Sequence, residues 1–384
     1  MRILHTADWH VGRRLGRHDR TEEMRAALDE VARIADEEQV DLILVAGDVF
    51  DRAAPPVESL SLGLTALTRL ARGRPVVVVA GNHDAPELFD ALAPLLRDRG
   101  VHVIGRIKAP DAGALLGPGE LGVPAVVAGF PFLREGRVID FMAETGTWYG
   151  AYAQKVAAIA DAYNTALVER AGTELVPILV AHFMVSGVRV GRSERELHIG
   201  DAYTATSQAI PAGPQYVALG HIHAPQPVPG APVPAAYSGS LLPMDFGEAG
   251  ESKRVVIVDV EPGRLATLRS VPIHAGRPLQ QVRGTWEEVA ARTDELAESY
   301  LDLTIAVGGP DPELGRRAAA LFPYLVRVRA ERPIAARRER SGDARPSDDD
   351  LYAAFVRATT GEDPPPGLAQ LFGATMEEVA DAPA

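Results

Sequence analysis

Five short segments of the chain carry side chains that bind divalent metals. They are Asp8-Trp9-His10, Gly47-Asp48-Val49-Phe50-Asp51, Gly81-Asn82-His83-Asp84, His182 and Gly220-His221-Ile222-His223. Histidine nitrogen mixed with aspartate and asparagine oxygen suits manganese, iron or zinc, and suits calcium poorly. The seven candidate ligands are Asp8, His10, Asp48, Asn82, His182, His221 and His223. So many ligands exceed one closed tetrahedral site. They suit two ions that share a carboxylate, for which Asp48 is the natural bridge, and such ions promote hydrolysis of phosphate esters.

The spacing within these segments has physical reasons. In Asp8-x-His10 and His221-x-His223, alternate residues of an extended segment point to the same side, so each pair faces one cavity. The glycines that precede the ligands, which let the backbone turn sharply, are Gly47, Gly81 and Gly220. Each motif alone is weak evidence, because a lone histidine such as His182 is more often a core residue than a ligand. Five motifs in this order indicate one site.

Apolar runs precede these segments and predict the strands that position them. The runs are Ile3–Ala7, Leu42–Ala46, Val76–Ala80, Val176–Ala181 and Tyr216–Leu219. Near-continuous apolar runs of this length indicate strands that are buried on both faces, with helices between them. The expected helices are Arg20–Glu37, Val57–Ala71, Pro86–Arg99 and Trp148–Ala171. This pattern predicts a layered α/β domain, in which ligands bind beyond the carboxyl ends of the strands.

The character of the chain changes after this domain, which we expect to span residues 1–270. Residues 271–334 combine isolated strand-like runs with two helical stretches and predict a small α+β domain. An arginine-rich linker follows at residues 335–346. Residues 347–384 contain two short amphipathic patterns, which predict a C-terminal helical segment.

Composition limits the possible functions. The absence of cysteine excludes disulfides, thiolate metal sites and cysteine nucleophiles. No stretch approaches the ~20 apolar residues of a membrane span, so we expect a soluble cytoplasmic protein without membrane contact. The net charge of −13 argues against a protein that coats nucleic acid unaided. The basic group Arg13, Arg14, Arg17 and Arg20 follows the first ligand pair, and is either a solvated face or a set of phosphate contacts.

The order of the ligand motifs resembles the calcineurin-like metallophosphoesterase superfamily. Further segments resemble its bacterial SbcD family of nuclease subunits. These segments are His5–Gly12, Ser193–Gly200, Tyr216–His223, Tyr237–Ser240 and Asp245–Glu248. The resemblance covers almost all of the first domain and, more loosely, the small domain. It implies a layered sandwich with a small capping domain and C-terminal helices.

The resemblance also implies roles for individual residues. One metal ion, typically manganese, would be held by Asp8, His10, Asp48 and His223, and a second by Asp48, Asn82, His182 and His221. His83 would be the acid that stabilises the transition state and protonates the leaving oxygen. Asp51 stands where archaeal and eukaryotic relatives have histidine, so a second catalytic histidine is not expected.

The function implied by the resemblance is a metal-dependent DNA nuclease. Such an enzyme is a 3'-5' double-strand exonuclease and a single-strand or hairpin endonuclease in DNA end processing, recombination and repair. It acts with an SbcC-type coiled-coil ATPase, which would supply much of the grip on DNA that the acidic chain lacks. The C-terminal helices would dock on this ATPase or pack back on the same chain. The family also forms homodimers through helices of the catalytic domain, for which the candidate residues are Leu60, Leu64, Leu67 and Phe89.

Other functions remain open. A small-molecule or cyclic-nucleotide phosphodiesterase would share every ligand but would need neither the small domain nor the C-terminal helices. A protein phosphatase usually has Asp-Arg-Gly and Gly-Asn-His-Glu where this chain has Asp51-Arg52-Ala53 and Gly81-Asn82-His83-Asp84. A non-enzymatic DNA-binding scaffold would require degraded ligands, and all of the ligands are present.

Overall fold

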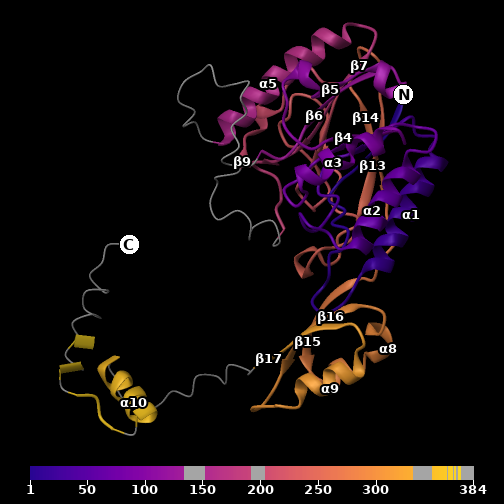
Figure 1. Ribbon diagram of the computed structural model, residues 1–384. Coiled ribbons are helices and arrows are strands. Elements are labelled where there is room, and N and C mark those ends of the chain that lie inside the picture. The colour runs from indigo at the N-terminus through magenta and orange to yellow at the C-terminus, as the bar shows by residue number, and fades with distance from the viewer. Residues whose placement is uncertain are drawn as a thin grey trace. The chain divides into compact units, whose positions relative to one another are not determined.

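The computed structural model describes residues 1–133, 152–191, 204–331, 348–360, 362–365, 367–368 and 371–372 (Figure 1). The chain divides into two compact units, Met1–Glu331 and Arg332–Ala384. The predicted linker at 335–346 and the family-like segment Ser193–Gly200 lie outside the described residues. Within the described residues, no helix is long and apolar enough to cross a membrane.

Two six-stranded sheets form the first part of the larger unit. The first sheet has the order β14-β13-β1-β2-β3-β4. Its strands are β1 (Arg2–Thr6), β2 (Leu42–Val45), β3 (Val76–Val79), β4 (Val101–Ile104), β13 (Arg254–Asp259) and β14 (Thr267–Pro272). Strands β1 to β4 are parallel, and β13 and β14 extend the sheet in antiparallel fashion. The predicted domain boundary at residue 270 falls inside β14, because this strand continues to Pro272.

The second sheet has the order β11-β12-β10-β7-β6-β5. Its strands are β5 (Leu115–Leu116), β6 (Ala125–Phe130), β7 (Val176–His182), β10 (Tyr216–Gly220), β11 (Gln226–Pro227) and β12 (Ala235–Tyr237). The five predicted strands are therefore divided between two sheets, with β1, β2 and β3 in one and β7 and β10 in the other. A separate two-stranded pair consists of β8 (Met184–Val185) and β9 (Thr204–Ala205).

Helices cover the outer face of each sheet and produce four layers (Figure 1). Helices α1 (Thr21–Glu37), α2 (Val57–Leu70) and α3 (Pro86–Arg97) share an apolar core with the first sheet, and α5 (Tyr152–Ala171) shares one with the second. A third core fills the space between the sheets. Neighbouring strand residues serve different cores, since Leu4 packs towards the helices and Ile3 towards the other sheet. The shorter helical elements are η1 (Pro110–Ala112), α4 (Pro118–Leu121), η4 (Ser207–Ala209) and η5 (Phe246–Glu248).

The outer helices contradict part of the predicted dimer surface. Leu67 of α2 and Phe89 of α3 are 0% and 1% exposed, because both face the first sheet. They cannot contribute to a surface between two copies. Leu60 and Leu64 are partly buried against the same core.

The small domain contains three parallel strands, β15 (Leu279–Thr285), β16 (Tyr300–Ala306) and β17 (Leu325–Glu331). Helices α7 (Trp286–Ala290), α8 (Thr293–Leu296) and α9 (Leu314–Leu321) lie between the strands in sequence and enclose a separate apolar core. Strands and helices alternate, which differs from the predicted α+β arrangement. The sequence of strand β15, LQQVRGT, has only Leu279 and Val282 as large apolar residues and therefore gives a weak strand pattern.

The second unit contains α10 (Asp348–Thr360) among its described residues. The side chains of Leu351 and Phe355 on this helix are exposed, as are those of Leu368 and Leu371. Tyr352 stacks on Phe372 with 4.2 Å between the ring centroids.

Candidate metal centre

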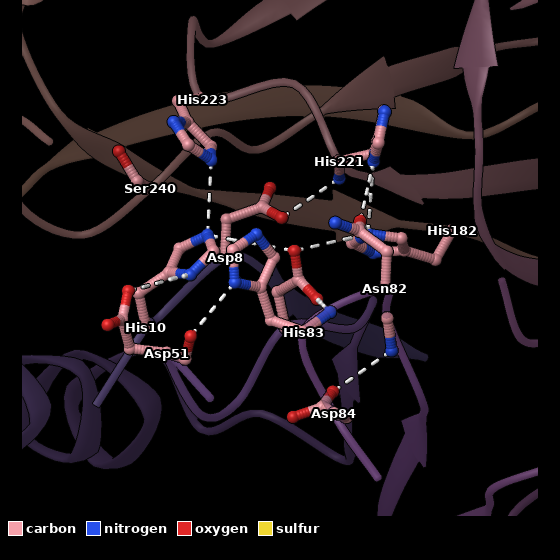
Figure 2. Close-up of polar contacts among 12 residues, drawn as sticks. Asp8, His10, Asp51, Asn82, His83, Asp84, His182, His221, His223 and Ser240 are labelled. Carbon is pink, nitrogen blue, oxygen red and sulfur yellow. Dashed lines mark hydrogen bonds and ion pairs between the residues drawn. The ribbon is translucent and has the colours of Figure 1, made fainter. Parts of the chain in front are cut away.

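All seven predicted ligands meet at one place, at the carboxyl ends of strands from both sheets. Figure 2 labels all of them except Asp48. Asp8 and His10 follow β1, Asp48 follows β2, and Asn82 follows β3 in the first sheet. His182 ends β7, and His221 and His223 follow β10 in the second sheet. The facing sheets thus bring together segments that are more than 200 residues apart, as in the contact of His10 with His223.

The backbone at the site adopts uncommon conformations. Asp8, His10, Asp48 and His221 have positive φ angles of 51°, 47°, 50° and 97°. Such strain persists only where the surrounding structure determines it, and it is concentrated at functional sites. The backbone hydrogen bonds from Asp8 to Gly47 and from His10 to Asp48, both 3.0 Å, hold the two loops together.

Glycine is required for different reasons at the three positions predicted to be turns. Gly47 adopts a φ of 93°, which agrees with a turn. Gly81 and Gly220 do not have positive φ, and Gly220 still belongs to β10. A Cβ at Gly81 would collide with Asp48, and one at Gly220 would collide with the carbonyl oxygen of Ala46. The close approach of Asp48 and of the Ala46 carbonyl group therefore requires glycine at these two positions.

One end of the site is built around His182. Its Nδ1 lies 2.8 Å from the carbonyl oxygen of Ala46, which can only accept, so Nδ1 carries a hydrogen. Its Nε2 lies 3.0 Å from Asn82 Oδ1 and 3.4 Å from Asp48 Oδ2, and His221 Nδ1 is 2.9 Å from the same Asn82 oxygen. Burial lowers the pKa of His182, but the carboxylates of Asp48 and Asp8 outweigh it and raise the pKa to about 9. The carboxylates that favour a positive charge on His182 would equally favour a metal cation beside the neutral imidazole.

The other end is built from Asp8, His10 and His223, whose ligand atoms lie within 4.8 Å of one another. His10 Nε2 is 3.1 Å from His223 Nε2. Burial lowers the pKa of His10 well below its ordinary value, which keeps the imidazole neutral, as a metal ligand must be. Asp8 Oδ2 is buried and has no hydrogen-bond partner among the described residues. Since buried polar atoms are nearly always paired, this oxygen fits a metal ligand.

Asp48 lies between the two ends. Its Oδ2 is 3.4 Å from His182 Nε2 and 3.7 Å from His10 Nε2, and its Oδ1 accepts a 2.8 Å hydrogen bond from the backbone N–H of His83. Burial would raise the pKa of Asp48, but the neighbouring histidines hold it well below its ordinary value. Burial raises the pKa of Asp8 to about 6. The pKa values of the two carboxyl groups are thus shifted in opposite directions. Asp48 is the carboxylate that lies near both ends of the site.

His83 stands beside the ligands, with its ring 4.7 Å from that of His10 (Figure 2). Its Nδ1 donates a 2.9 Å hydrogen bond to the carbonyl oxygen of Asp51, and its side chain is partly exposed. His83 also groups with His10 and Asp48 at distances that suit a metal ligand. Its predicted role as an acid stays a prediction. The Asp51 carboxylate pairs with Arg13 Nη1 at 3.2 Å.

The basic group after the first ligand pair is not one surface. Arg14 and Arg17 are exposed and Arg13 is partly exposed, but Arg20 is only 3% exposed. Arg20 donates to Glu23 and to the carbonyl oxygen of Pro243. Arg20 therefore belongs neither to a solvated face nor to a phosphate-binding group.

Three buried residues that hold the ligands were missed as site residues in the sequence. Asp84 accepts hydrogen bonds from the backbone N–H groups of Val49, Phe50 and Gly81 at 3.2, 3.0 and 2.9 Å. It therefore fixes the loops after β2 and β3 to each other. Burial, with a smaller effect from Asp48, raises the pKa of Asp84 to about 6. The tight Gly-Asn-His-Asp motif was the available signal for it.

Glu248 and Lys253 are the other two. Glu248 Oε1 lies 3.2 Å from His223 Nδ1, and Lys253 Nζ lies 2.6 Å from Glu248 Oε2. Burial would raise the pKa of Glu248, but His223 and Lys253 lower it to about 2. A signal existed for Lys253, since the chain uses arginine for nearly all its basic residues and has lysine only at Lys108, Lys155 and Lys253. A compact ammonium fits a buried position that a guanidinium would overfill.

Comparisons with known proteins identify the family of the chain. The calcineurin-like phosphoesterase family model matches residues 1–225, which hold all seven candidate ligands. The SbcD component of nuclease SbcCD from Bacillus subtilis is 38% identical over 80% of this chain and 79% of that protein. The corresponding proteins from Rhodobacter capsulatus and Escherichia coli K12 are 34% and 31% identical, over 87% and 88% of this chain and 82% and 87% of those proteins. With its mixed nitrogen and oxygen donors, the site suits divalent metals. The chain therefore belongs to the calcineurin-like phosphoesterase family and, within it, to the SbcD family of SbcCD nuclease components.

Proposed function

We propose that this chain is a metal-dependent DNA nuclease, the SbcD component of an SbcCD-type complex. The convergence of seven nitrogen and oxygen ligands from both sheets, in a chain 31–38% identical to SbcD proteins over most of its length, carries the proposal. The finer reaction is 3'-5' degradation of duplex ends together with cleavage of single strands and hairpins.

Two divalent ions fit the residues of the site. One would be held by Asp8, His10, Asp48 and His223, and the other by Asp48, Asn82, His182 and His221. The contacts of Asp48 Oδ2 with both His182 and His10 support its place in both sets. When bound, two such ions lower the pKa of water and neutralise the charge of the phosphate during in-line attack. Manganese suits the mixed histidine, carboxylate and amide donors, and we propose it as the working ion.

His83 is proposed to act as the acid of the reaction. Its Nδ1 donates to the carbonyl oxygen of Asp51, so a second proton resides on Nε2 when the imidazole is charged. The partly exposed ring can present that proton to the leaving oxygen of the DNA strand. The backbone N–H of His83 donates to Asp48, which fixes the ring relative to the bridging carboxylate.

The rest of the chain is proposed to serve assembly. Residues 273–331 would form the capping domain, 335–346 the linker and 347–384 the segment that docks an SbcC-type ATPase. The exposed apolar side chains of Leu351, Phe355, Leu368 and Leu371 support docking, because a partner protein could bury them. We propose that the complex works in the cytoplasm with two copies of each of its two proteins.

Digestion of end-labelled DNA tests the proposed function. Duplex and hairpin substrates would be incubated with manganese, with and without the ATPase partner, beside a small phosphodiester such as bis(p-nitrophenyl) phosphate. We expect both DNA substrates to be cut, with the duplex depending most on the partner. Hydrolysis of the small phosphodiester alone, even with the partner present, would instead favour a small-molecule phosphodiesterase.

Removal of residues 347–384 tests the docking segment. The expected result is loss of complex formation with the ATPase in size-exclusion chromatography, while manganese-dependent cleavage of single strands persists. Unchanged complex formation would contradict the docking role and leave the nuclease assignment intact.

A further inference from the structure

The turn η5 lies directly behind the ligand His223. Glu248, the last residue of this turn, is 1% exposed. Its Oε1 accepts from His223 Nδ1 at 3.2 Å, while Oε2 accepts from Lys253 Nζ at 2.6 Å and from the backbone N–H of Met244 at 3.0 Å. A carboxylate can only accept in these contacts, so the hydrogen of His223 stays on Nδ1. Its Nε2, which lies 3.1 Å from His10 Nε2, then keeps its lone pair directed into the site.

Lys253 fixes both ends of this contact. Its side chain is 3% exposed, and Nζ donates to Glu248 and, at 2.9 Å, to the carbonyl oxygen of His223. The ammonium group thus links the backbone of the ligand to the carboxylate that orients its ring. A buried charge is costly unless it is fully paired, and this pairing satisfies both residues.

The other side of the same turn contacts the small domain. The Phe246 ring, 9% exposed, packs with Leu15 and with Leu279 and Tyr300 of the small domain. Leu15 belongs to the loop that begins with the ligands Asp8 and His10. Turn η5 therefore contacts the small domain through its first residue and a ligand through its last.

We propose that Glu248 is a positioning residue that fixes the hydrogen of His223 on Nδ1 for metal binding, and that the small domain supports it through Phe246. The inference rests on the proposed two-metal function and deepens it. Hydrogen bonds from a ligand histidine to a carboxylate fix its orientation, and their loss typically costs about 10- to 100-fold in metal affinity. The small domain would then be a structural part of the metal centre.

Glu248→Gln is the direct test. Lys253 and Met244 both require an acceptor, so the amide oxygen would face them and the amide NH2 would face His223 Nδ1. This reversal would move the histidine hydrogen from Nδ1 to Nε2, the atom directed into the site. We expect 15N spectra of histidine-labelled protein to show that move. Titration with Mn2+ alone, followed by the spin resonance of the free ion, should show one of two bound ions weakened about 10- to 100-fold.

Asp302→Asn is the matched control. Asp302 is also a 1% exposed carboxylate paired with cations, Arg327 and Arg329, but it lies in the small domain. The Asp302→Asn substitution should lower the thermal stability of the protein without changing manganese affinity or any histidine signal. Unchanged manganese affinity and an unchanged His223 tautomer in folded Glu248→Gln would overturn the role of Glu248.

Phe246→Leu tests the support from the small domain, and serves if Glu248→Gln does not fold. We expect manganese binding to weaken about 2- to 30-fold, as for couplings through packed side chains. Phe322→Leu, a similar change in the separate core of the small domain, should leave manganese affinity unchanged. Equal affinities in the two variants would refute the support. These readouts do not use DNA, so a failed nuclease assay would leave them interpretable.

Discussion

His182 and His223 stand at the two ends of the metal centre and are held in different ways. His182 Nδ1 is bonded to a main-chain acceptor, the carbonyl oxygen of Ala46 at 2.8 Å. His223 Nδ1 is bonded to a side chain, Glu248, which depends in turn on Lys253. The first arrangement needs only the backbone at Ala46, directly after β2, and the place of His182 at the end of β7. The second requires three side chains and a turn that contacts the small domain.

The difference indicates which end tolerates change. A main-chain acceptor cannot be removed by substitution, so the contact at His182 Nδ1 is altered only when the backbone or its packing moves. The His223 end can be altered one side chain at a time. It is also the end through which movement of the small domain would reach the metals.

The largest expected effect concerns His83, which is also held by a main-chain acceptor. His83→Ala removes the proposed acid and should lower the cleavage rate about 10²- to 10⁴-fold, the usual contribution of general acid catalysis. Manganese stoichiometry should remain at two, because His83 is proposed not to be a ligand. The exposed His274 provides the control, since His274→Ala should retain the full rate. Loss of one bound ion from His83→Ala would instead make His83 a ligand, as its grouping with His10 and Asp48 permits.

Gly47→Ala should displace His182 and so disrupt the His182 end of the site. Gly47 has a φ of 93°, and a Cβ there would collide with the ring of His182. Displacement of reacting groups by about 1 Å can cost 100-fold in rate, and we expect a loss of about that size with weaker binding of one ion. Gly73→Ala controls for the backbone strain, because Gly73 has a φ of 80° and open space around it. Equal activity of the two variants would show that His182 does not depend on Gly47.

Local sequence patterns predicted the ligands but not what holds them. Asp8, Asp48 and Asn82 were found because each follows an apolar strand within a few residues. The division of the strands between two sheets was not predicted, since an apolar run indicates burial but not the neighbouring strand. Leu67 and Phe89 were misplaced on a surface for a related reason, because a helix pattern does not reveal which apolar side faces the sheet.

The residues behind the ligands were missed because their contacts are distant in sequence. Glu248 lies 25 residues from His223, and no periodic pattern joins them. Asp84 lies within a recognised motif, yet two of its partners, Val49 and Phe50, are more than 30 residues away. Only the folded chain reveals such contacts.

Asp84→Asn tests the loops that carry the ligands after β2 and β3, rather than the ligands themselves. An amide oxygen accepts at one position, whereas the Asp84 carboxylate serves three backbone N–H groups with two oxygens. At least one buried donor would lose its partner, at a cost of about 1–3 kcal/mol in the free energy of unfolding. Urea denaturation of metal-free protein measures this cost. A stability equal to that of the wild type would mean that the loops after β2 and β3 are held by other contacts.

The smallest effect is expected at Glu251, the second carboxylate near Lys253. Lys253 Nζ lies 3.2 Å from Glu251 and 2.6 Å from Glu248, and Glu251 is the more exposed of the two carboxylates, at 19% against 1%. In Glu251→Gln, Lys253 keeps its contacts with Glu248 and with the carbonyl oxygen of His223. The free energy of unfolding should therefore change by less than about 1 kcal/mol. Manganese affinity should be unchanged, because the contacts of Lys253 with Glu248 and of Glu248 with His223 Nδ1 stay in place. If Glu251→Gln weakened manganese binding as much as Glu248→Gln, the charge around Lys253 rather than the hydrogen bond to Nδ1 would control the His223 end.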